Sequence, residues 1–311
     1  MISLIPQIES AYGFKVTAFS PAPRGFVAET YYLTTDKGKY FIKIINNLRF
    51  AVNLPNALPV QANLAKRLDF IPSPLTTVNG EFQWISTDNK AISLYEYIDG
   101  KPNTTDSNGN PYGSEEDFSV IIPLAAGVYK SDINCEMVET FPVCMEAEFE
   151  AFLNDTLLLS NEVLACVNSH RSFIVEKWSE YKQICKRIFG VRKDFYITHG
   201  DMPGNLMVDA NGKLYIIDWD DICIAPIERD FWLYMNSSVN IQRIATMLAD
   251  NGITWTFSQD YYRYYLYTRF FDDLYGYMEL DLLKIKDATI CAKKIETEVF
   301  DWLIPIWGRQ Y

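Results

Sequence analysis

Several side chains that can act on phosphates or metal ions lie within one short span of the sequence, Tyr196–Asp221: His199, Asp201, Asn205, Asp218, Asp220 and Asp221. Two apolar runs separate its polar ends, and the turn-forming pair Asn211-Gly212 joins them. An antiparallel hairpin about this turn returns Asn205 and Asp218 to the same end, with Asp201 nearby. A small set of hard oxygen donors suits Mg²⁺, which keeps water and shares its shell with phosphates. The span therefore predicts phosphoryl transfer, with Asp201 placed to accept a proton from a hydroxyl.

The motif H-G-D-x-x-x-x-N, followed by I-D-W-D, resembles the aminoglycoside phosphotransferase family of small-molecule kinases, as does the segment "IDWDDICIAPIERDFW". The resemblance implies an α+β, bilobal protein-kinase-like fold, with ATP and Mg²⁺ as cofactors and an alcohol group as phosphate acceptor. It also implies residue roles. Asp201 would be the catalytic base and His199 would orient its loop. Asn205 and Asp218 would bind Mg²⁺, and Asp220 would be either a further ligand or a solvated side chain. Arg229 and Asp230 would brace the loop.

The elements that must position these groups fall into two parts. Short segments rich in β-branched and aromatic residues precede residue 98: "FKVTAF", "AETYYLTT", "KYFIKII", "FQWIS" and "AISLYEYI". "TTDKGKY" predicts a hairpin turn, and "PVQANLAKRL" predicts one inserted helix. The polar, turn-rich stretch that starts at Asp99 marks a boundary. We therefore expect a nucleotide-binding N-terminal lobe, 1–98, and a mostly helical C-terminal lobe, 99–311, that contains the catalytic hairpin.

A kinase of this kind needs a lysine on its third strand, and "KYFIKII" supplies Lys43 between apolar neighbours. The usual partner of that lysine is a glutamate on the inserted helix. This helix has no glutamate, and Gln61 stands at the expected place. A glutamine can accept a hydrogen bond from an ammonium group but cannot neutralise it. The departure allows a slow kinase or a protein that binds nucleotide without turnover.

Two further segments would contact the nucleotide. The loop "FSPAPRGFVAETYY" occupies the position of a phosphate-covering loop, and Ser20, Arg24 and Gly25 could donate to phosphate, although an ordinary turn explains the segment as well. "SLYEYIDG" resembles the hinge between lobes. By position, the Glu96 carbonyl and the Ile98 amide would face the adenine edge, and Tyr95 would stand at the back of the pocket.

The phosphate acceptor is predicted to bind at a helix that contains "RFFDDLYGYMELD", in which Asp272, Asp273 and Glu279 lie close together. The rings of Phe270, Phe271, Tyr275 and Tyr277 alternate with these acids. Carboxylates and aromatic rings suit a cationic ligand such as an aminocyclitol. The alternative is that the rings are core and the acids are solvated.

The composition of the chain disfavours some classes of binding partner and some cellular locations. The chain has 311 residues, of which 28 are basic and 40 acidic, for a net charge of -12, and this balance disfavours nucleic acid and anionic membrane. Its cysteines are scattered and form no C-x-x-C pair. We expect a cytoplasmic protein without signal peptide or membrane span, whose partner is a small cationic acceptor. The oligomeric state is not predicted.

Three functional hypotheses stay open at this point. The first is a kinase for an aminoglycoside-like antibiotic, and the second is a metabolic kinase for choline, homoserine or a sugar amine. The third is a pseudokinase that binds nucleotide only, for which Gln61 is the warning sign. A purely structural protein would leave Asp201, Asn205 and Asp218 unexplained.

Overall fold

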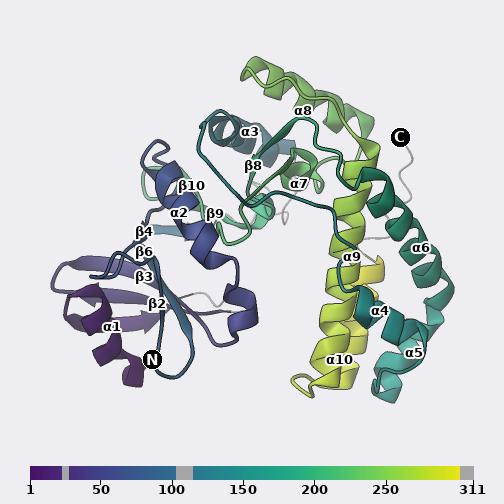
Figure 1. Cartoon of the computed structure of the whole chain (residues 1–311), viewed down its shortest axis with the longest axis horizontal. Helices are drawn as coiled ribbons and strands as arrows, with labels where there is room; N and C mark the ends of the chain where they lie inside the picture. Colours follow the sequence, from purple (N-terminus) through teal and green to yellow (C-terminus); the bar gives the residue numbers. More distant parts are fainter. Residues whose placement is uncertain (23–27, 103–114, 302–311) are drawn as a thin grey trace. The chain divides into compact units, whose positions relative to one another are not determined.

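The computed structural model describes residues 1–22, 28–102 and 115–301 (Figure 1). The chain divides into two compact units. Unit 1 comprises Met1–Val138, Phe195–Ala225 and Asn251–Ile253. Unit 2 comprises Glu139–Asp194, Pro226–Asp250 and Thr254–Tyr311. Unit 1 thus contains the N-terminal sheet together with the predicted catalytic hairpin, whereas the lobe boundary at residue 98 stays a prediction.

Unit 1 is built on an antiparallel sheet in the order β1-β2-β3-β6-β4, with β5 also paired to β6. Its strands are β1 (Val16–Pro21), β2 (Ala28–Thr35), β3 (Gly38–Ile45), β4 (Pro74–Leu75), β5 (Gln83–Ile85) and β6 (Ala91–Glu96). Each strand predicted before residue 98 corresponds to β1, β2, β3, β5 or β6, so those predictions are confirmed. The predicted turn is confirmed too, because Thr35 pairs with Gly38 at the tip of the β2–β3 hairpin.

The two faces of this sheet are covered by different segments. On one face, Leu4, Ile8 and Tyr12 pack against strand residues such as Ile42 and Leu94. They come from the 3₁₀ turn η1 (Ile2–Leu4) and helix α1 (Ile5–Tyr12), neither of which was predicted from the sequence. The signals for α1 were present in the apolar spacing of Ile8 and Tyr12 and in Gly13, which ends the helix at φ 69°.

Helix α2 (Leu54–Ala65) and the 3₁₀ turn η2 (Leu48–Ala51) cover the other face, where Leu54 and Leu58 pack against Ile45 and Tyr95. The inserted helix is confirmed, but its predicted start at Pro59 is wrong. The helix begins at Leu54, with a proline in its first turn, where the missing N–H costs nothing. Pro59 lies inside the helix.

The remainder of unit 1 contains the predicted catalytic hairpin. Two smaller sheets have the orders β10-β9-β7 and β11-β8. The elements are β7 (Gly100–Pro102), α3 (Glu115–Tyr129), β8 (Phe195–Thr198), η3 (Met202–Gly204), β9 (Leu206–Asp209), β10 (Leu214–Ile216) and β11 (Cys223–Pro226). The predicted hairpin is confirmed: β9 and β10 pair antiparallel, and Gly212 takes a positive φ of 83° in the connecting turn.

Unit 2 is helical. Its elements are α4 (Glu146–Leu153), α5 (Asn161–Ser169), α6 (Arg171–Ile188), α7 (Glu228–Phe231), α8 (Ser238–Asp250), α9 (Gln259–Leu282), α10 (Ala288–Lys294) and a π-helical segment, Ile295–Phe300. The core contains a ring cluster in which Phe271 of α9 lies 4.8 Å from Phe149 and 4.9 Å from Trp178 between ring centroids. Helix α4 starts only at Glu146, because Phe141 and Met145 take positive φ in the segment before it.

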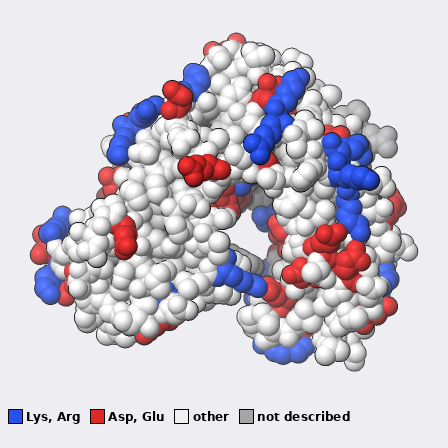
Figure 2. Space-filling model, in the orientation of Figure 1, with Lys and Arg blue, Asp and Glu red and all other residues white. Residues whose placement is uncertain are grey.

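Two surface properties bear on partners. Acidic and basic side chains are interspersed over the face in Figure 2, within a net charge of -12. Across the described ranges, every helix is too short or too polar to cross a bilayer.

Candidate active site

Lys43 reaches the predicted catalytic hairpin. The alternation of β3 places it on the same face as Phe41 and Ile45, and the residue is only 8% exposed. Its ammonium Nζ lies 2.5 Å from Oδ1 of Asp218 and 2.5 Å from Oδ2 of Asp220. Folding of unit 1 therefore joins the predicted phosphate lysine to the I-D-W-D motif.

The hairpin brings its two polar ends together as its sequence predicts. The Ile217 amide donates to the Asn205 carbonyl at 2.9 Å, which fixes Asn205 beside the start of the I-D-W-D turn. Asn205 Nδ2 donates to the Asp201 carbonyl at 2.7 Å and to Asp201 Oδ2 at 3.1 Å. Since that nitrogen is engaged, the amide oxygen of Asn205 is the atom left to accept or to bind a cation.

His199 links the catalytic loop to the end of β10. The residue is 1% exposed, and its Nδ1 accepts from the Asp201 amide at 3.2 Å. Its Nε2 therefore carries the proton and donates to the Ile217 carbonyl at 2.8 Å. The ring also packs edge-on against Trp219, with centroids 4.6 Å apart. These contacts fit the orienting role implied for His199.

Charges in this cluster depend on one another. Partial desolvation favours the neutral form of Asp218, but the Lys43 ammonium outweighs it and holds the pKa of Asp218 below its ordinary value. Burial dominates at Asp220 and, with the adjacent Asp218 charge, raises the pKa of Asp220 to about 6 despite Lys43. Burial also opposes the charged form of Lys43, yet the two carboxylates raise the pKa of its ammonium above the usual range. The side chain of Asp218 is 44% exposed, against 18% for Asp220.

A cavity of about 310 Å³ collects these groups. Its lining includes Lys43, His199, Asp201, Asn205, Asp218, Asp220 and Asp221, together with Arg49, Phe50, Val52, Asn53 and Leu54. Arg49 was not predicted from the sequence; its guanidinium lies over the Phe50 ring at 4.5 Å. The only local signal is Asn47, whose side chain accepts from the Arg49 amide and starts the turn η2. Nothing in the spacing alone indicates that this turn faces the hairpin.

The donors around the cavity are suited to Mg²⁺. Among the described residues, no group of three or more His, Cys, Asp or Glu side chains is arranged to hold a metal ion. The available set is instead one amide oxygen, from Asn205, and the carboxylate of Asp218, of which only Oδ1 contacts Lys43. Few hard oxygens suit a cation that keeps water and shares its shell with phosphates. The residues present therefore fit Mg²⁺ bound together with a nucleotide.

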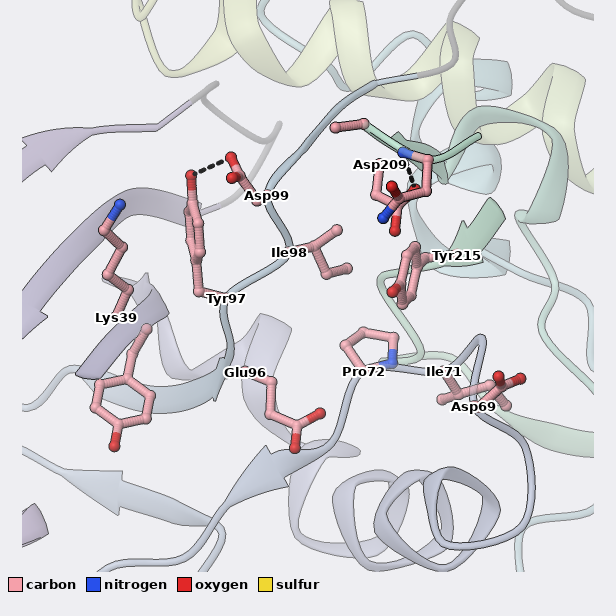
Figure 3. Close-up of a pocket in the computed structure, with 13 residues that line it drawn as sticks. Lys39, Asp69, Ile71, Pro72, Glu96, Tyr97, Ile98, Asp99, Asp209 and Tyr215 are labelled. Atoms are coloured by element: carbon pink, nitrogen blue, oxygen red, sulfur yellow. Dashed lines mark hydrogen bonds between the residues drawn. The ribbon is translucent and has the colours of Figure 1, made fainter. Parts of the chain in front are cut away.

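The hinge residues line a second cavity. Glu96 and Ile98 lie around a space of about 610 Å³ with Tyr97, Pro72 and Tyr215 (Figure 3). Asp201, Asp218 and Asp220 are absent from its lining. The predicted hinge segment is therefore at a cavity, but not at the one that holds Lys43.

Tyr95 is separate from this second cavity. It is 8% exposed, its ring lies 6.1 Å from that of Phe41, and burial together with Asp220 and Asp218 raises its pKa. Tyr95 thus lies near Asp218 and Asp220. Its place there is compatible with the back of a nucleotide pocket.

Gln61 does not pair with Lys43, which corrects the expectation that its amide takes the place of the helix glutamate. Its Nε2 donates to the Pro72 carbonyl at 2.8 Å, and the residue is 1% exposed. The oxygen Oε1 of Gln61, the atom that could accept from an ammonium group, is buried without a hydrogen-bond partner, while Lys43 is held by Asp218 and Asp220. Ser20 lies exposed on β1 and lines neither cavity, and Arg24 and Gly25 lie outside the described residues.

The predicted acceptor residues lie on α9 in unit 2. Asp273 accepts from Arg269, four residues earlier, at 2.8 Å, whereas Asp272 is exposed and Glu279 is half-buried. Phe270 and Phe271 are both 0% exposed, so they pack in the core and do not offer their faces to a ligand. The aromatic part of the acceptor prediction is therefore wrong for these two rings. Burial, not ligand binding, explains their spacing.

Comparison with known proteins agrees with this geometry. Residues 178–267 match the model of the phosphotransferase enzyme family. Among curated proteins no sequence matches the chain. A similar solved structure is spectinomycin phosphotransferase in complex with ADP and spectinomycin, at 17% identity and TM-score 0.73, over 99% of this chain and 98% of that one.

Two further kinases share the fold. The choline kinase of Streptococcus pneumoniae is 14% identical with TM-score 0.59, over 99% of this chain and 98% of the other. An amicoumacin kinase is 13% identical with TM-score 0.61, over 96% of this chain and 93% of the other. The chain thus matches the model of the phosphotransferase enzyme family over residues 178–267, within an α+β fold that it shares with small-molecule kinases over nearly its whole length.

Proposed function

We propose that this chain is an ATP-dependent kinase that transfers the γ-phosphate to a hydroxyl group of a small, cationic acceptor. One observation carries the proposal: a single cavity of unit 1 contains Lys43, Asp201, Asn205 and Asp218. A phosphate-binding lysine, two metal-binding side chains and a carboxylate base are the parts that phosphoryl transfer requires. The similar structures contain ADP or AMP-PNP, which supports a nucleotide as donor.

Each residue has a role that follows from its contacts. Lys43 would bind the α- and β-phosphates from the floor of the cavity. Asp201, exposed and fixed by Asn205 and His199, would accept the proton of the acceptor hydroxyl as the oxygen attacks phosphorus. Asn205 and Asp218 would hold Mg²⁺, which when bound neutralises charge on the phosphate oxygens.

Two side chains that were not predicted from the sequence complete the proposed donor site. Phe41 shares a face of β3 with Lys43 and is half-buried, so its ring can cover the adenine. Arg49 adds a second positive charge at the cavity, where a planar guanidinium suits phosphate oxygens.

The acceptor class is inferred from the similar proteins and from α9. Spectinomycin and choline are the cationic molecules named with two of them. Asp272 is exposed on α9, and Asp273 and Glu279 are near it in sequence. These carboxylates could attract an ammonium group, so the proposal covers antibiotic and metabolic amino alcohols alike. A cytoplasmic location belongs to the same proposal.

The test is phosphate transfer by the purified chain, with ATP and Mg²⁺, to spectinomycin, choline, amicoumacin and sugar amines, with a neutral alcohol as negative control. Asp201→Ala should lower the rate at least about a hundredfold. Asp88→Ala, which removes an exposed carboxylate on a turn of unit 1, should not. Normal turnover by Asp201→Ala would exclude Asp201 as the base.

A nucleotide-binding protein without transfer activity is the second candidate. It is favoured by the absence of a helix acid opposite Lys43 and by the contact of Gln61 with Pro72. ADP binding without transfer to any member of the panel would support it over the kinase.

A further inference from the structure

The charge on Lys43 needs a permanent partner. In protein kinases the lysine that binds the phosphates is positioned by a helix glutamate that is distinct from the metal ligands. Helix α2, Leu54–Ala65, contains no Asp or Glu. Gln61 donates from Nε2 to Pro72, and its Oε1 has no hydrogen-bond partner, so the helix supplies neither a charge nor a hydrogen bond to the lysine. The partner must come from elsewhere in unit 1.

Two carboxylates contact Lys43, and they differ in their surroundings. Asp218 is 44% exposed, and only its Oδ1 contacts the lysine, so its other oxygen is available to a cation. Asp220 is 18% exposed, and its Oδ1 is buried without a hydrogen-bond partner. An isolated buried carboxylate is costly, and the contact between its Oδ2 and Lys43 offsets that cost.

The residue between the two aspartates fixes their places. Trp219 is 1% exposed and donates its indole N–H to the Ile216 carbonyl at 2.8 Å. Its ring packs against His199. The backbone on both sides of Trp219 is therefore anchored in the core. Asp220 is held against Lys43 by this anchor.

We propose that Asp220 is the positioning residue for Lys43 and takes the place of the glutamate that α2 lacks, which leaves Asp218 to the metal ion. The inference rests on the proposed function and deepens it, because it divides the two aspartates of I-D-W-D between two tasks. Asp220 holds the ammonium group toward the phosphates whether or not a metal ion is present. It need not touch the nucleotide itself.

The direction in which Asp220→Asn changes the ADP affinity distinguishes a positioning role from a purely electrostatic effect of the charge. Removal of a negative charge beside a polyanion ordinarily strengthens its binding, because repulsion falls. Asp220→Asn should instead weaken ADP binding in EDTA about tenfold, because Lys43 loses the group that positions it. Isothermal titration calorimetry of the full chain with ADP in EDTA measures this affinity without any contribution from Mg²⁺ or from turnover.

Matched variants of neighbouring residues serve as controls. Asp221→Asn removes the same charge at the same cavity, but the ion pairs of Lys43 are made with Asp218 and Asp220. This variant should bind metal-free ADP as tightly as wild type or more tightly. Gln61→Leu removes the contact with Pro72 and should also leave ADP affinity within about twofold, because Gln61 does not hold Lys43. Asp220→Glu keeps the charge and should recover most of the lost affinity.

The same variants distinguish the proposed role from that of a metal ligand. If Asp220 bound Mg²⁺, Asp220→Asn would raise the Mg²⁺ concentration needed for ADP binding and would leave the metal-free affinity unchanged or improved, and the proposal would fail. A lower melting temperature with unchanged metal-free affinity would overturn it as well. Failure of phosphate transfer by the wild type would refute the proposed function alone, since the ADP measurement requires no transfer. Absence of ADP binding by the wild type would refute both.

Discussion

The predicted catalytic hairpin of unit 1 and helix α9 of unit 2 both combine carboxylates with aromatic residues, but the carboxylates have different partners. Asp218 and Asp220 meet a cation from β3, 175 and 177 residues away in the chain. Asp273 of α9 meets Arg269 of its own helix. An ion pair between two residues of one helix can form without tertiary structure, whereas the ion pairs of the hairpin carboxylates with Lys43 require the folded unit. A long-range partner is therefore the better sign of a constructed site.

The largest expected effect contrasts the two regions in catalysis. Asp218→Asn should lower kcat about a thousandfold, because the cavity would lose the charge that is proposed to hold the metal ion. Asp272→Asn should change the acceptor KM less than about tenfold and leave kcat nearly unchanged, because an exposed carboxylate contributes to attraction only. Steady-state kinetics with ATP and the best acceptor measures both. A large fall in kcat for Asp272→Asn would bring α9 into the chemistry and end the contrast.

The second effect concerns the rings of α9. Phe271→Ala should destabilise the protein by about 4 kcal/mol, because the side chain is fully buried among Phe149, Trp178 and Tyr181. Urea unfolding measures the loss, and Tyr275→Ala, half-buried on the same helix, should cost less. A small loss of stability together with a raised acceptor KM would instead support the original prediction that the Phe271 ring contacts the acceptor.

A third prediction compares the pKa of Glu228, a buried carboxyl group, with that of Asp218, which is paired with a cation. Glu228 of α7 is 1% exposed, and its Oε1 accepts from the Ser258 amide at 2.7 Å. Burial raises its pKa from 4.5 to about 7, whereas Lys43 lowers that of Asp218. As pH rises, Glu228 therefore loses its proton at a lower pH in the unfolded chain than in the folded protein. The contribution of Glu228 to the free energy of unfolding should fall between about pH 4.5 and pH 7 and stay flat above.

Glu228→Gln should remove this dependence. Relative to wild type, the variant should gain roughly 3 kcal/mol between pH 4.5 and pH 8, because a glutamine at this position has no charge to bury. Urea unfolding of both proteins at the two pH values gives the difference. A difference that does not change with pH would show that Glu228 is ionised in the folded protein without cost.

The contrast also explains how far the sequence predicts the molecule. The strands, the β9–β10 hairpin and α9 follow from alternation, a turn pair and helical spacing, which are local properties. The convergence of Asn205 with Asp218 follows as well, because a hairpin must return its ends to one place. Arg49 and the contact of Asp220 with Lys43 do not follow, since they depend on tertiary packing.

Helical spacing is a weaker predictor of which side chains face a ligand. It places Phe270, Phe271 and Asp272 around the axis of α9 but does not say which side of the axis the core covers. Phe270 and Phe271 are buried in unit 2, and the sequence of α9 alone does not predict this burial. Gln61 shows the same limit, because its position on α2 matches the expected helix residue while Pro72 takes its hydrogen bond.

The smallest effect tests the α9 ion pair itself. Arg269 and Asp273 are four residues apart, and their side chains are 46% and 25% exposed. Burial raises the pKa of Asp273 and opposes the stabilisation by Arg269. We expect a coupling of less than about 0.5 kcal/mol in a double-mutant cycle of Arg269→Ala and Asp273→Ala, measured by urea unfolding. Coupling above about 1.5 kcal/mol would show that α9 also contains a constructed charge site, because solvated helix pairs do not reach that value.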